Sequence, residues 1–256
     1  MIVTPIKTRI FRQGENLAAF ISEHIPTMKE GEVVVVTSKI VSLAENRVVD
    51  LLTPEDRERY VMQEAEVAVH TPYTIMTLRD GMVMSSAGVD ESNANGKLIL
   101  LPKDAYASAH QLWMDLKKQW GLTNLGLIIT DSRTSLLRRG SMGTAIAYAG
   151  FHAIKRYVGK PDIFGRILQV SIANTADPLA AAAVHTMGEG NEQQPLAKIE
   201  GANLAFTQDK IEKSEIQVHI KDDVYGPLFQ AVLGAKPQQL NPKYEQDIAH
   251  KQEKKT

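Results

Sequence analysis

The chain contains no cysteine among its 256 residues. This absence excludes disulfides, cysteine-ligated zinc and thiol catalysis, and it is compatible with a reducing cytosol. Aromatic residues make up only 6% of the chain. They are scattered along it, so they provide no stacking platform for single-stranded nucleic acid. Because the chain can form neither a disulfide nor a thiol-bound metal site, it must be stabilised by a buried apolar core. Its length is sufficient for such a core.

An excess of either charge is also missing, because 29 Lys and Arg residues face 30 Asp and Glu residues. This balance argues against binding to nucleic acid or to an anionic membrane surface. The longest apolar runs, such as residues 179–184, are far shorter than the ~20 residues that span a bilayer. The first residues show no apolar signal-peptide segment. We therefore expect a soluble, cytoplasmic protein with neither membrane nor nucleic acid as a partner.

The pattern of apolar residues predicts interleaved strands and helices. The β-branched run at residues 33–36 indicates a strand buried on both faces, and residues 104–120 have the spacing of a helix. Asp80-Gly81 predicts a hairpin turn between strands at residues 74–79 and 82–87. Thr53-Pro54 begins a helix that we expect to reach about residue 69. The fold class is therefore α/β (mixed α+β), without a clear internal domain boundary.

The second half of the chain gives weaker signals. Residues 143–150 are small and apolar, which suits close packing of a helix or a strand. We expect a strand at residues 165–172 and a short helix at residues 177–185. Residues 202–240 are more polar and are expected to form a C-terminal extension packed on the core, with a strand at 215–220 and a helix at 224–233. Residues 241–256 are charged and are expected to be a frayed tail.

The most informative stretch follows an apolar strand expected at residues 125–130, which we expect to end at Thr130-Asp131-Ser132. A carboxylate beside a hydroxyl at a strand end offers oxygen ligands to a hard cation such as Mg²⁺ or Mn²⁺. The basic residues that follow, Arg133, Arg138 and Arg139, suit the anionic substrate that such a metal holds. An ordinary strand-to-loop turn has the same composition, so this stretch alone does not decide between the two interpretations.

Two further acidic segments follow apolar elements, one at residues 90–96 and one at residues 189–192. In the second, Gly188 and Gly190 flank Glu189 with little bulk, so the main chain can approach a ligand closely. The donors and acceptors that follow, Asn191, Glu192, Gln193 and Gln194, are of the kind that binds the edge of a nucleobase. Spacing along the chain does not show whether these segments meet. His152 and His185 stand alone, and we interpret both as structural.

Several blocks, taken in order, resemble the coenzyme F-420:L-glutamate ligase family (F-420-0 gamma-glutamyl ligases). The resemblance runs from residue 1 to about residue 201. It implies a ligase domain over residues 1–201 with two interleaved lobes, and a homodimer. The matching blocks are residues 33–42 with Ala44-Glu45 and Arg47-Val48-Val49, Ala87-Gly88-Val89-Asp90 with Ser92-Asn93, Ile128-Ile129-Thr130-Asp131, and residues 179–183 leading into Met187-Gly188-Glu189.

The resemblance implies a function: GTP and a divalent metal serve to join L-glutamate to a carboxylate of a deazaflavin precursor. The expected cofactors are GTP, Mn²⁺ or Mg²⁺, and a monovalent cation as an optional addition. Four positions match metal ligands of the family: Asp90, Asp131, Ser132 and Glu189. Others match contacts to the guanine nucleotide: Ile10, Phe11, Ser38, Lys39, Asn93, Met187, Gly188, Glu189, Gly190, Asn191, Glu192, Gln193 and Gln194.

The implied chemistry is coherent. A carboxylate is a poor acyl donor, and transfer of the γ-phosphoryl group converts it to an acyl phosphate that the glutamate amine can attack. Metal ions neutralise charge that develops on the phosphate oxygens, and Arg138 or Arg139 can neutralise substrate anion.

The chain departs from the family at two places. The family's Ser-Lys after the strand at residues 33–36 becomes Ser42-Leu43, which removes a cation. Its Asp-Thr-x-Gly-Arg-Pro-Trp-Arg becomes Asp131-Ser-Arg-Thr-Ser-Leu-Leu-Arg138, which removes a ring and a guanidinium suited to a flat anionic substrate. Two alternatives follow: a γ-glutamyl ligase acting on folate or another carboxylate acceptor, and a non-catalytic nucleotide-binding or regulatory protein on the same scaffold. We expect binding of GTP and metal with poor use of the deazaflavin precursor.

Overall fold

The structure is a computed structural model that describes residues 1–229. The chain forms two compact units, and neither is continuous in sequence. Unit 1 comprises Met1–Arg47 and Leu101–Ile216, and unit 2 comprises Val48–Leu100 with the described residues from Gln217 onward. The mixture of helices with parallel and antiparallel strands confirms the predicted α/β class.

Unit 1 is built on a five-stranded sheet with the order β1-β13-β2-β8-β9. Its strands are β1 (Ile2–Ile6), β2 (Glu32–Thr37), β8 (Leu125–Thr134), β9 (Ser141–Ala149) and β13 (Leu196–Glu200). Only the central pair, β2 with β8, is parallel. The four consecutive valines of β2 are fully buried, as predicted for a strand covered on both faces.

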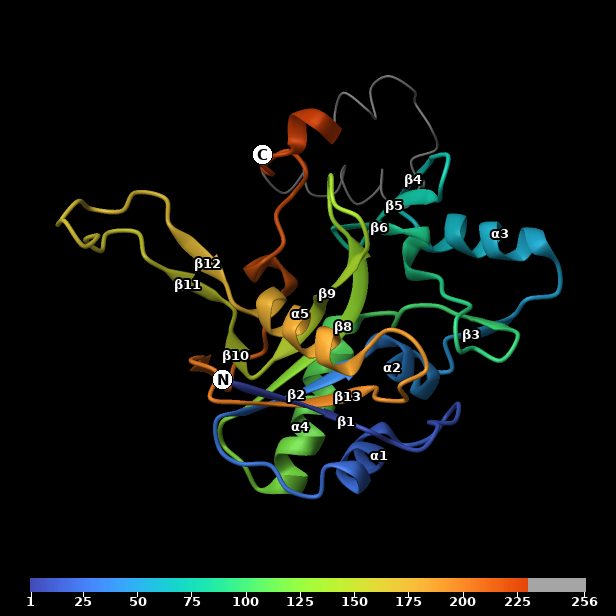
Figure 1. The fold of residues 1–256 in the computed structure, drawn as a ribbon, viewed down its shortest axis with the longest axis horizontal. Helices are drawn as coiled ribbons and strands as arrows, with labels where there is room; N and C mark the ends of the chain where they lie inside the picture. The colour runs from blue at the N-terminus through green and yellow to red at the C-terminus, as the bar shows by residue number, and fades with distance from the viewer. Residues whose placement is uncertain (230–256) are drawn as a thin grey trace, which may run out of the picture. The chain divides into compact units, whose positions relative to one another are not determined.

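Helices cover both faces of this sheet (Figure 1): α1 (Leu17–His24) and α4 (Ala105–Trp120) lie on one face and α5 (Ala176–Met187) lies on the other. Helix α2 (Ser38–Ala44) follows β2 directly. The predicted helix at residues 104–120 is confirmed. Asp104 caps its N-terminus by accepting from the amide of Ala107, and Gly121 ends it in the left-handed region at φ 66°.

Unit 2 contains α3 (Pro54–Glu64) and a three-stranded antiparallel sheet of β4 (Val67–His70), β5 (Ile75–Arg79) and β6 (Met82–Ser85). Strands β3 (Val48–Asp50) and β7 (Lys97–Ile99) form a separate pair. The predicted hairpin is confirmed, with Asp80 at φ 48° and Gly81 at φ 71° between β5 and β6. The apolar core of this unit is formed by Val61, Ala65, Ala68, Ile75, Ala87, Val89, Leu98 and Leu100.

Three expectations about element bounds were wrong. The helix from residue 53 ends at Glu64 rather than near residue 69, because residues 67–70 pair with β5 as strand β4. The strand expected at residues 125–130 continues to Thr134, because its second half pairs with β9. The strand expected at residues 165–172 is mostly absent: only β12 (Ile172–Asn174) forms, paired with β11 (Ile154–Arg156).

Residues 143–150, expected to be a helix or a strand, are buried along their whole length, and residues 143–149 belong to β9. Gly143 lies against α5 so closely that an added Cβ would come within 2.5 Å of the Cβ of Val184. The close packing expected of this segment is therefore made inside unit 1. It supplies no exposed surface for a second subunit.

The segment after residue 201 packs on unit 1. Strand β14 (Ala205–Phe206) pairs with β10 (Phe151–His152). Further along, the Glu215 carboxylate accepts from the Tyr148 hydroxyl at 2.5 Å and lies 2.8 Å from His152 Nδ1. Burial, together with the nearby Glu215 carboxylate, raises the pKa of Tyr148. Residues 215–220 form no strand, which corrects that expectation. The expected helix at 224–233 extends beyond the described residues, and the expected tail at 241–256 lies outside them.

A membrane-crossing element was not expected. Within residues 1–229, every helix is too short or too polar to cross a bilayer.

Candidate functional site

The carboxyl ends of the two parallel strands of unit 1 meet at one edge of the sheet. Thr37, the last residue of β2, pairs with Thr130 of β8, so Ser38 at the start of α2 and Asp131 of β8 each follow a residue of this pair. This edge of a parallel pair is where α/β proteins bind ligands. Ser38 is buried at the start of α2, and Lys39 beside it is half-buried. The resemblance assigned both residues to nucleotide contacts, and in the structure they directly follow β2, the strand that pairs with the one carrying Asp131.

Asp131 and Ser132 lie inside β8 rather than at its end. Asp131 is half-buried opposite Thr144 of β9, and Ser132 is exposed opposite Gly143. Successive side chains of a strand point to opposite faces. The carboxylate and the hydroxyl that are adjacent in sequence are therefore directed to opposite sides of the ribbon. The metal role of each stays a prediction, and this alternation weakens the case for Ser132.

Glu189 lies on the loop that follows α5 and contacts the start of β9. Helix α5 ends at Met187, which is buried in the core, and Gly188 follows at φ 81°. The Glu189 carboxylate then accepts from the Ser141 hydroxyl of β9 at 2.8 Å. The loop continues to Pro195, whose carbonyl accepts from the amide of Thr37 at 3.0 Å. Residues 188–195 therefore connect β9 with the end of β2.

The loop between β1 and α1 is tied to this segment by a pair of hydrogen bonds. The amide of Thr8 donates to the carbonyl of Gln193 at 3.1 Å, and the Gln193 side-chain amide donates to the carbonyl of Thr8 at 2.8 Å. Beyond Thr8, the Ile10 side chain is 73% exposed, whereas Phe11 is buried and packs edge-on against Phe20 at 4.9 Å. The two regions that the resemblance assigned to nucleotide contacts are thus neighbours.

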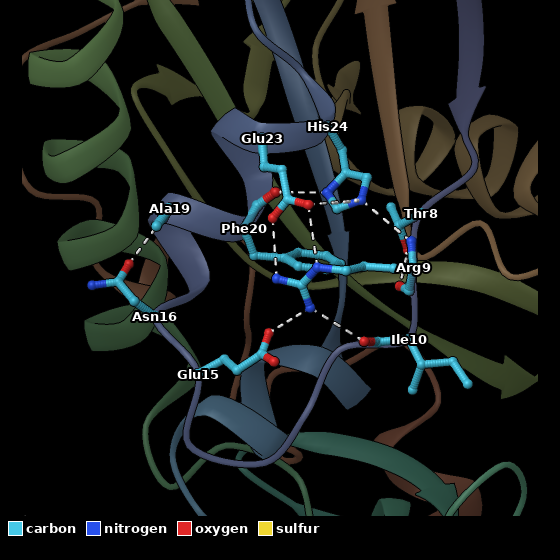
Figure 2. A network of polar contacts seen from close by, with 9 residues as sticks. All are labelled: Thr8, Arg9, Ile10, Glu15, Asn16, Ala19, Phe20, Glu23 and His24. Atoms are coloured by element: carbon cyan, nitrogen blue, oxygen red, sulfur yellow. Dashed lines mark hydrogen bonds and ion pairs between the residues drawn. The ribbon is translucent and has the colours of Figure 1, made fainter.

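Arg9 fixes the course of the loop between β1 and α1 (Figure 2). Its guanidinium forms ion pairs with Glu15 at 2.8 Å and Glu23 at 3.0 Å, and it lies 4.8 Å from the centre of the Phe20 ring. Its amide donates to His24 Nε2 at 3.2 Å. The hydrogen bond from Arg9 lowers the pKa of Glu23. This exposed network holds the loop against α1. It therefore fixes the position of Thr8, which binds Gln193.

Arg138 and Arg139 lie in the exposed connection between β8 and β9. Neither forms an ion pair with a residue in the described part of the chain. The side chain of Arg138 donates to the neighbouring carbonyl of Leu137 at 3.5 Å. Leu137 itself is 98% exposed and has φ 56°. Two exposed cations on this connection, a few residues from Asp131 in the sequence, suit an anionic substrate.

Asp90 and Asn93 belong to unit 2. Asp90 is half-buried, and its two carboxylate oxygens accept from the amide and the hydroxyl of Ser92 at 2.7 and 3.0 Å. Asn93 is exposed with φ 54°, a conformation that Asn tolerates better than most residues. Both therefore lie on a tight polar turn, as the sequence predicted.

The predicted metal ligands are divided between the two units. Across residues 1–229, no three His, Asp or Glu side chains gather around a point where an ion would bind. Asp90 is in unit 2, whereas Asp131 and Glu189 are in unit 1. In chemistry, the donor set fits a hard divalent cation, because it consists of carboxylate oxygens. A metal held by Asp90, Asp131 and Glu189 therefore stays a prediction.

Sequence reasoning missed the residues that organise this edge. Ser141, Thr8 and Arg9 were not proposed, although each holds or supports a predicted site residue. None carried a local signal in the sequence. The partners of Ser141 and Thr8 lie far away in the sequence, and the partners of Arg9 lie in or just before α1. Pairing of the strands is what brings them into place.

Comparison with known proteins identifies the family. The model of the F420-0:Gamma-glutamyl ligase family matches residues 5–201. The chain belongs to this family. Its relatives include the Coenzyme F420:L-glutamate ligases of Archaeoglobus fulgidus (32% identical, covering 80% of this chain and 90% of the relative) and Methanopyrus kandleri (33%, covering 77% and 84%). The ligase of the same name from Methanocaldococcus jannaschii is 31% identical over 81% of this chain and 90% of its own.

Proposed function

We propose that this protein is a ligase that uses GTP and a divalent metal to form a γ-glutamyl-type amide bond between L-glutamate and a carboxylate acceptor. The observation that carries the proposal is membership of the F420-0:gamma-glutamyl ligase family over residues 5–201, with relatives that are named as ligases for L-glutamate. The cysteine-free composition is consistent with action in the cytoplasm, which is part of the proposal.

The arrangement of unit 1 supports binding of a nucleotide at the edge where β2 and β8 end. Ser38 and Lys39 begin α2 at that edge, and the loop of residues 188–194 borders it. Gly188, Gly190, Asn191 and Glu192 are exposed, and the Glu192 carboxylate accepts from the amide of Gly190 at 2.8 Å. The side chain of Gln193 is occupied by Thr8. Its role is therefore to shape the loop, and we assign base recognition to its neighbours.

The proposed reaction has two steps. The acceptor carboxylate attacks the γ-phosphorus of GTP, so an acyl phosphate forms and GDP leaves. The amine of L-glutamate then attacks the acyl carbon, a C–N bond forms, and inorganic phosphate leaves with loss of a proton from the amine. Asp131 and Glu189 would be the metal ligands of unit 1, and Asp90 is the candidate ligand of unit 2. The metal, when bound, would neutralise charge on the phosphate oxygens. Arg138 and Arg139 would neutralise the acceptor or the phosphoryl group.

The acceptor is proposed to differ from the deazaflavin precursor. In the exposed connection after β8, residues 134–137 carry no ring and no guanidinium, and Leu136 and Leu137 are 53% and 98% exposed. A stacked ring is worth about 0.5–1.5 kcal/mol and a charged hydrogen bond about 1.5–3 kcal/mol. Their joint loss corresponds to about one to three decades in affinity. A folate or another carboxylate is therefore the preferred acceptor.

We also propose a homodimer, supported by the ribbon of residues 154–174. The ribbon contains β11 and β12 and extends away from the five-stranded sheet of unit 1 (Figure 1). Ile163, Phe164 and Val170 on it are 91%, 90% and 84% exposed. A two-stranded ribbon is marginally stable alone, and contiguous exposed apolar residues indicate an interface. The ribbon has four cations and a single carboxylate, whereas the rest of the chain is net negative. The charge of the ribbon therefore complements the charge of the remaining part of a second copy.

A non-catalytic nucleotide-binding protein on the same scaffold is the competing function, and Leu43 in place of the family's Lys favours it. The two are separated by incubating the protein with GTP, Mn²⁺ and L-glutamate, together with either a folate or the deazaflavin precursor. A ligase releases GDP and glutamylated product in equal amounts, and Asp131→Asn abolishes both while circular dichroism stays unchanged. GTP binding without GDP release for any acceptor would instead support the competing function.

A further inference from the structure

Unit 2 contains a strained turn just before Asp90. Ser86, Ala87 and Gly88 have φ of 53°, 50° and 69° in succession. The left-handed region is natural for glycine but unfavourable for the other two residues. Such a conformation persists only where surrounding groups impose it, and it is commonest at functional sites.

Two buried side chains grip the turn at Ala87. The amide of Ala87 donates to the Thr77 hydroxyl at 2.8 Å, and its carbonyl accepts from Arg79 Nη1 at 3.0 Å. Thr77 in turn donates to the carbonyl of Met84 at 2.8 Å. Thr77 and Arg79 are 2% and 5% exposed. Both polar groups of one strained residue are therefore held by the same strand, β5.

The Arg79 guanidinium is itself fixed from the opposite side. Its Nη2 lies 2.9 Å from the Glu64 carboxylate at the end of α3, and the side chains of this pair are only 6% and 16% exposed. Burial of a charged pair is costly unless geometry and hydrogen bonds compensate for lost water. Arg79 thus joins α3 to the turn of residues 86–88 through a rigid, two-sided contact.

The turn leads directly to the candidate ligand. The amide of Val89 donates to the carbonyl of Ser86 at 2.8 Å, and Asp90 then exchanges two main-chain hydrogen bonds with Ile99, at 3.0 and 2.8 Å. The turn sets the point at which Asp90 enters this pairing. We infer that Thr77 and Arg79 are positioning residues that hold the turn of residues 86–88 so that Asp90 presents its carboxylate to a divalent cation. This inference rests on the metal role of Asp90 in the proposed function.

A purely structural role for the grip would give a different result. If Thr77 and Arg79 served only the fold, their substitution would lower thermal stability without changing the affinity of the folded protein for metal. Outer residues that orient a ligand typically change metal affinity by about 10–100-fold. Metal affinity at a temperature where every variant is folded therefore separates the two roles.

The experiment measures binding of Mn²⁺ alone by electron paramagnetic resonance, in the full-length protein. The test variants are Thr77→Val, which removes only the hydroxyl, and Arg79→Lys, which keeps the charge but not the planar fork. Thr77→Ser restores the hydroxyl. Thr71→Val is the matched control, because the Thr71 hydroxyl holds another turn of unit 2 by donating to Thr74 at 2.7 Å. Asp90→Asn removes the candidate ligand itself.

We expect Thr77→Val, Arg79→Lys and Asp90→Asn each to weaken Mn²⁺ binding by about tenfold or more, with Thr77→Ser and Thr71→Val close to the unsubstituted protein. Hydrogen exchange at the Ala87 amide should be faster in Thr77→Val. If Asp90→Asn weakens binding while Thr77→Val and Arg79→Lys do not, the positioning role is overturned and the proposed metal site stands. If Asp90→Asn has no effect, or no Mn²⁺ binds, the metal role of Asp90 and this inference fail together.

Discussion

Thr8 and Gln193 are joined by two hydrogen bonds, one between their main chains and one from the Gln193 side chain to the Thr8 carbonyl. They lie 185 residues apart in the sequence. Their contact unites the loop between β1 and α1 with the loop after α5. The shape of the proposed nucleotide site therefore depends on this contact between Thr8 and Gln193, which lie near the two ends of the region matched by the family, residues 5–201.

Shortening this tie should weaken nucleotide binding. Gln193 has φ 60°, which Asn tolerates, so Gln193→Asn removes reach without adding strain. Loss of one neutral hydrogen bond costs about 0.5–1.5 kcal/mol, which predicts a rise of roughly 2–10-fold in the KM for GTP. Gln208→Asn is the matched control, since Gln208 donates to the carbonyl of Thr123 at 2.9 Å away from this loop. Equal KM values for the two variants would contradict the prediction.

Gly188 should be intolerant of a side chain. Its φ of 81° and ψ of 167° lie in a region that only glycine adopts without strain. An added Cβ would also lie 2.4 Å from the Glu192 carboxyl carbon, so it would displace this side chain from the amide of Gly190. We expect Gly188→Ala to destabilise the protein by about 1–3 kcal/mol and to weaken GTP binding, as followed by urea unfolding and by nucleotide titration. Gly159→Ala is the control, because Gly159 has the same φ with no atom within 4 Å of the added Cβ. Gly159→Ala should lower stability without changing the affinity for GTP. If both variants lose the same affinity for GTP, the effect does not depend on the contact between Gly188 and Glu192.

Asp56 should make stability depend on pH. Hydrogen bonds from the amides of Thr53 and Leu52 lower the pKa of Asp56 below its ordinary value of 3.8. The folded state therefore favours the charged form, and its stabilising contribution is complete above pH 3.8 and lost as the pH falls through the lowered pKa. Asp56→Asn should reduce the melting temperature at pH 7, with a difference that shrinks below pH 3.8. A difference that stays constant down to pH 2 would refute this origin.

The ribbon of residues 154–174 should carry the contact between subunits. A charge at its exposed tip is incompatible with a desolvated interface, so Phe164→Glu should convert the dimer to a monomer of about 28 kDa in light scattering. Leu52→Glu is the control, because Leu52 is 83% exposed but lies in unit 2. A Phe164→Glu variant that keeps the mass of a dimer would exclude the ribbon as the interface.

Local patterns predicted the elements whose causes are local. The buried valines of β2, the turn at Asp80-Gly81 and the helix at residues 104–120 each follow from residues adjacent in sequence. Pairing between distant segments decided the rest. Strand β8 continues past Thr130 because β9 pairs with it, and α3 ends at Glu64 because the next residues join β5.

The candidate site divides in the same way. Polar residues after apolar elements pointed to Asp131 and Glu189, because side-chain chemistry is visible in sequence, and the family resemblance added Ser38. The tie from Thr8 to Gln193 and the contact of Ser141 with Glu189 depend on strand pairing, for which the sequence carried no local signal. The hydrogen bond from Arg79 to the Ala87 carbonyl could not be predicted for another reason. It serves a left-handed alanine, a conformation that residue type does not indicate.

The source of the oxygen in the released phosphate tests the central claim most directly. In the proposed ligase, the acceptor carboxylate supplies the fourth oxygen of inorganic phosphate through the acyl phosphate. A nucleotide-hydrolysing protein would take that oxygen from water. The reaction with GTP, Mn²⁺, L-glutamate and the acceptor is run in water enriched in oxygen-18, and the phosphate is analysed by mass spectrometry. The ligase predicts phosphate without label from the solvent, and one solvent-derived oxygen-18 atom per phosphate would contradict it.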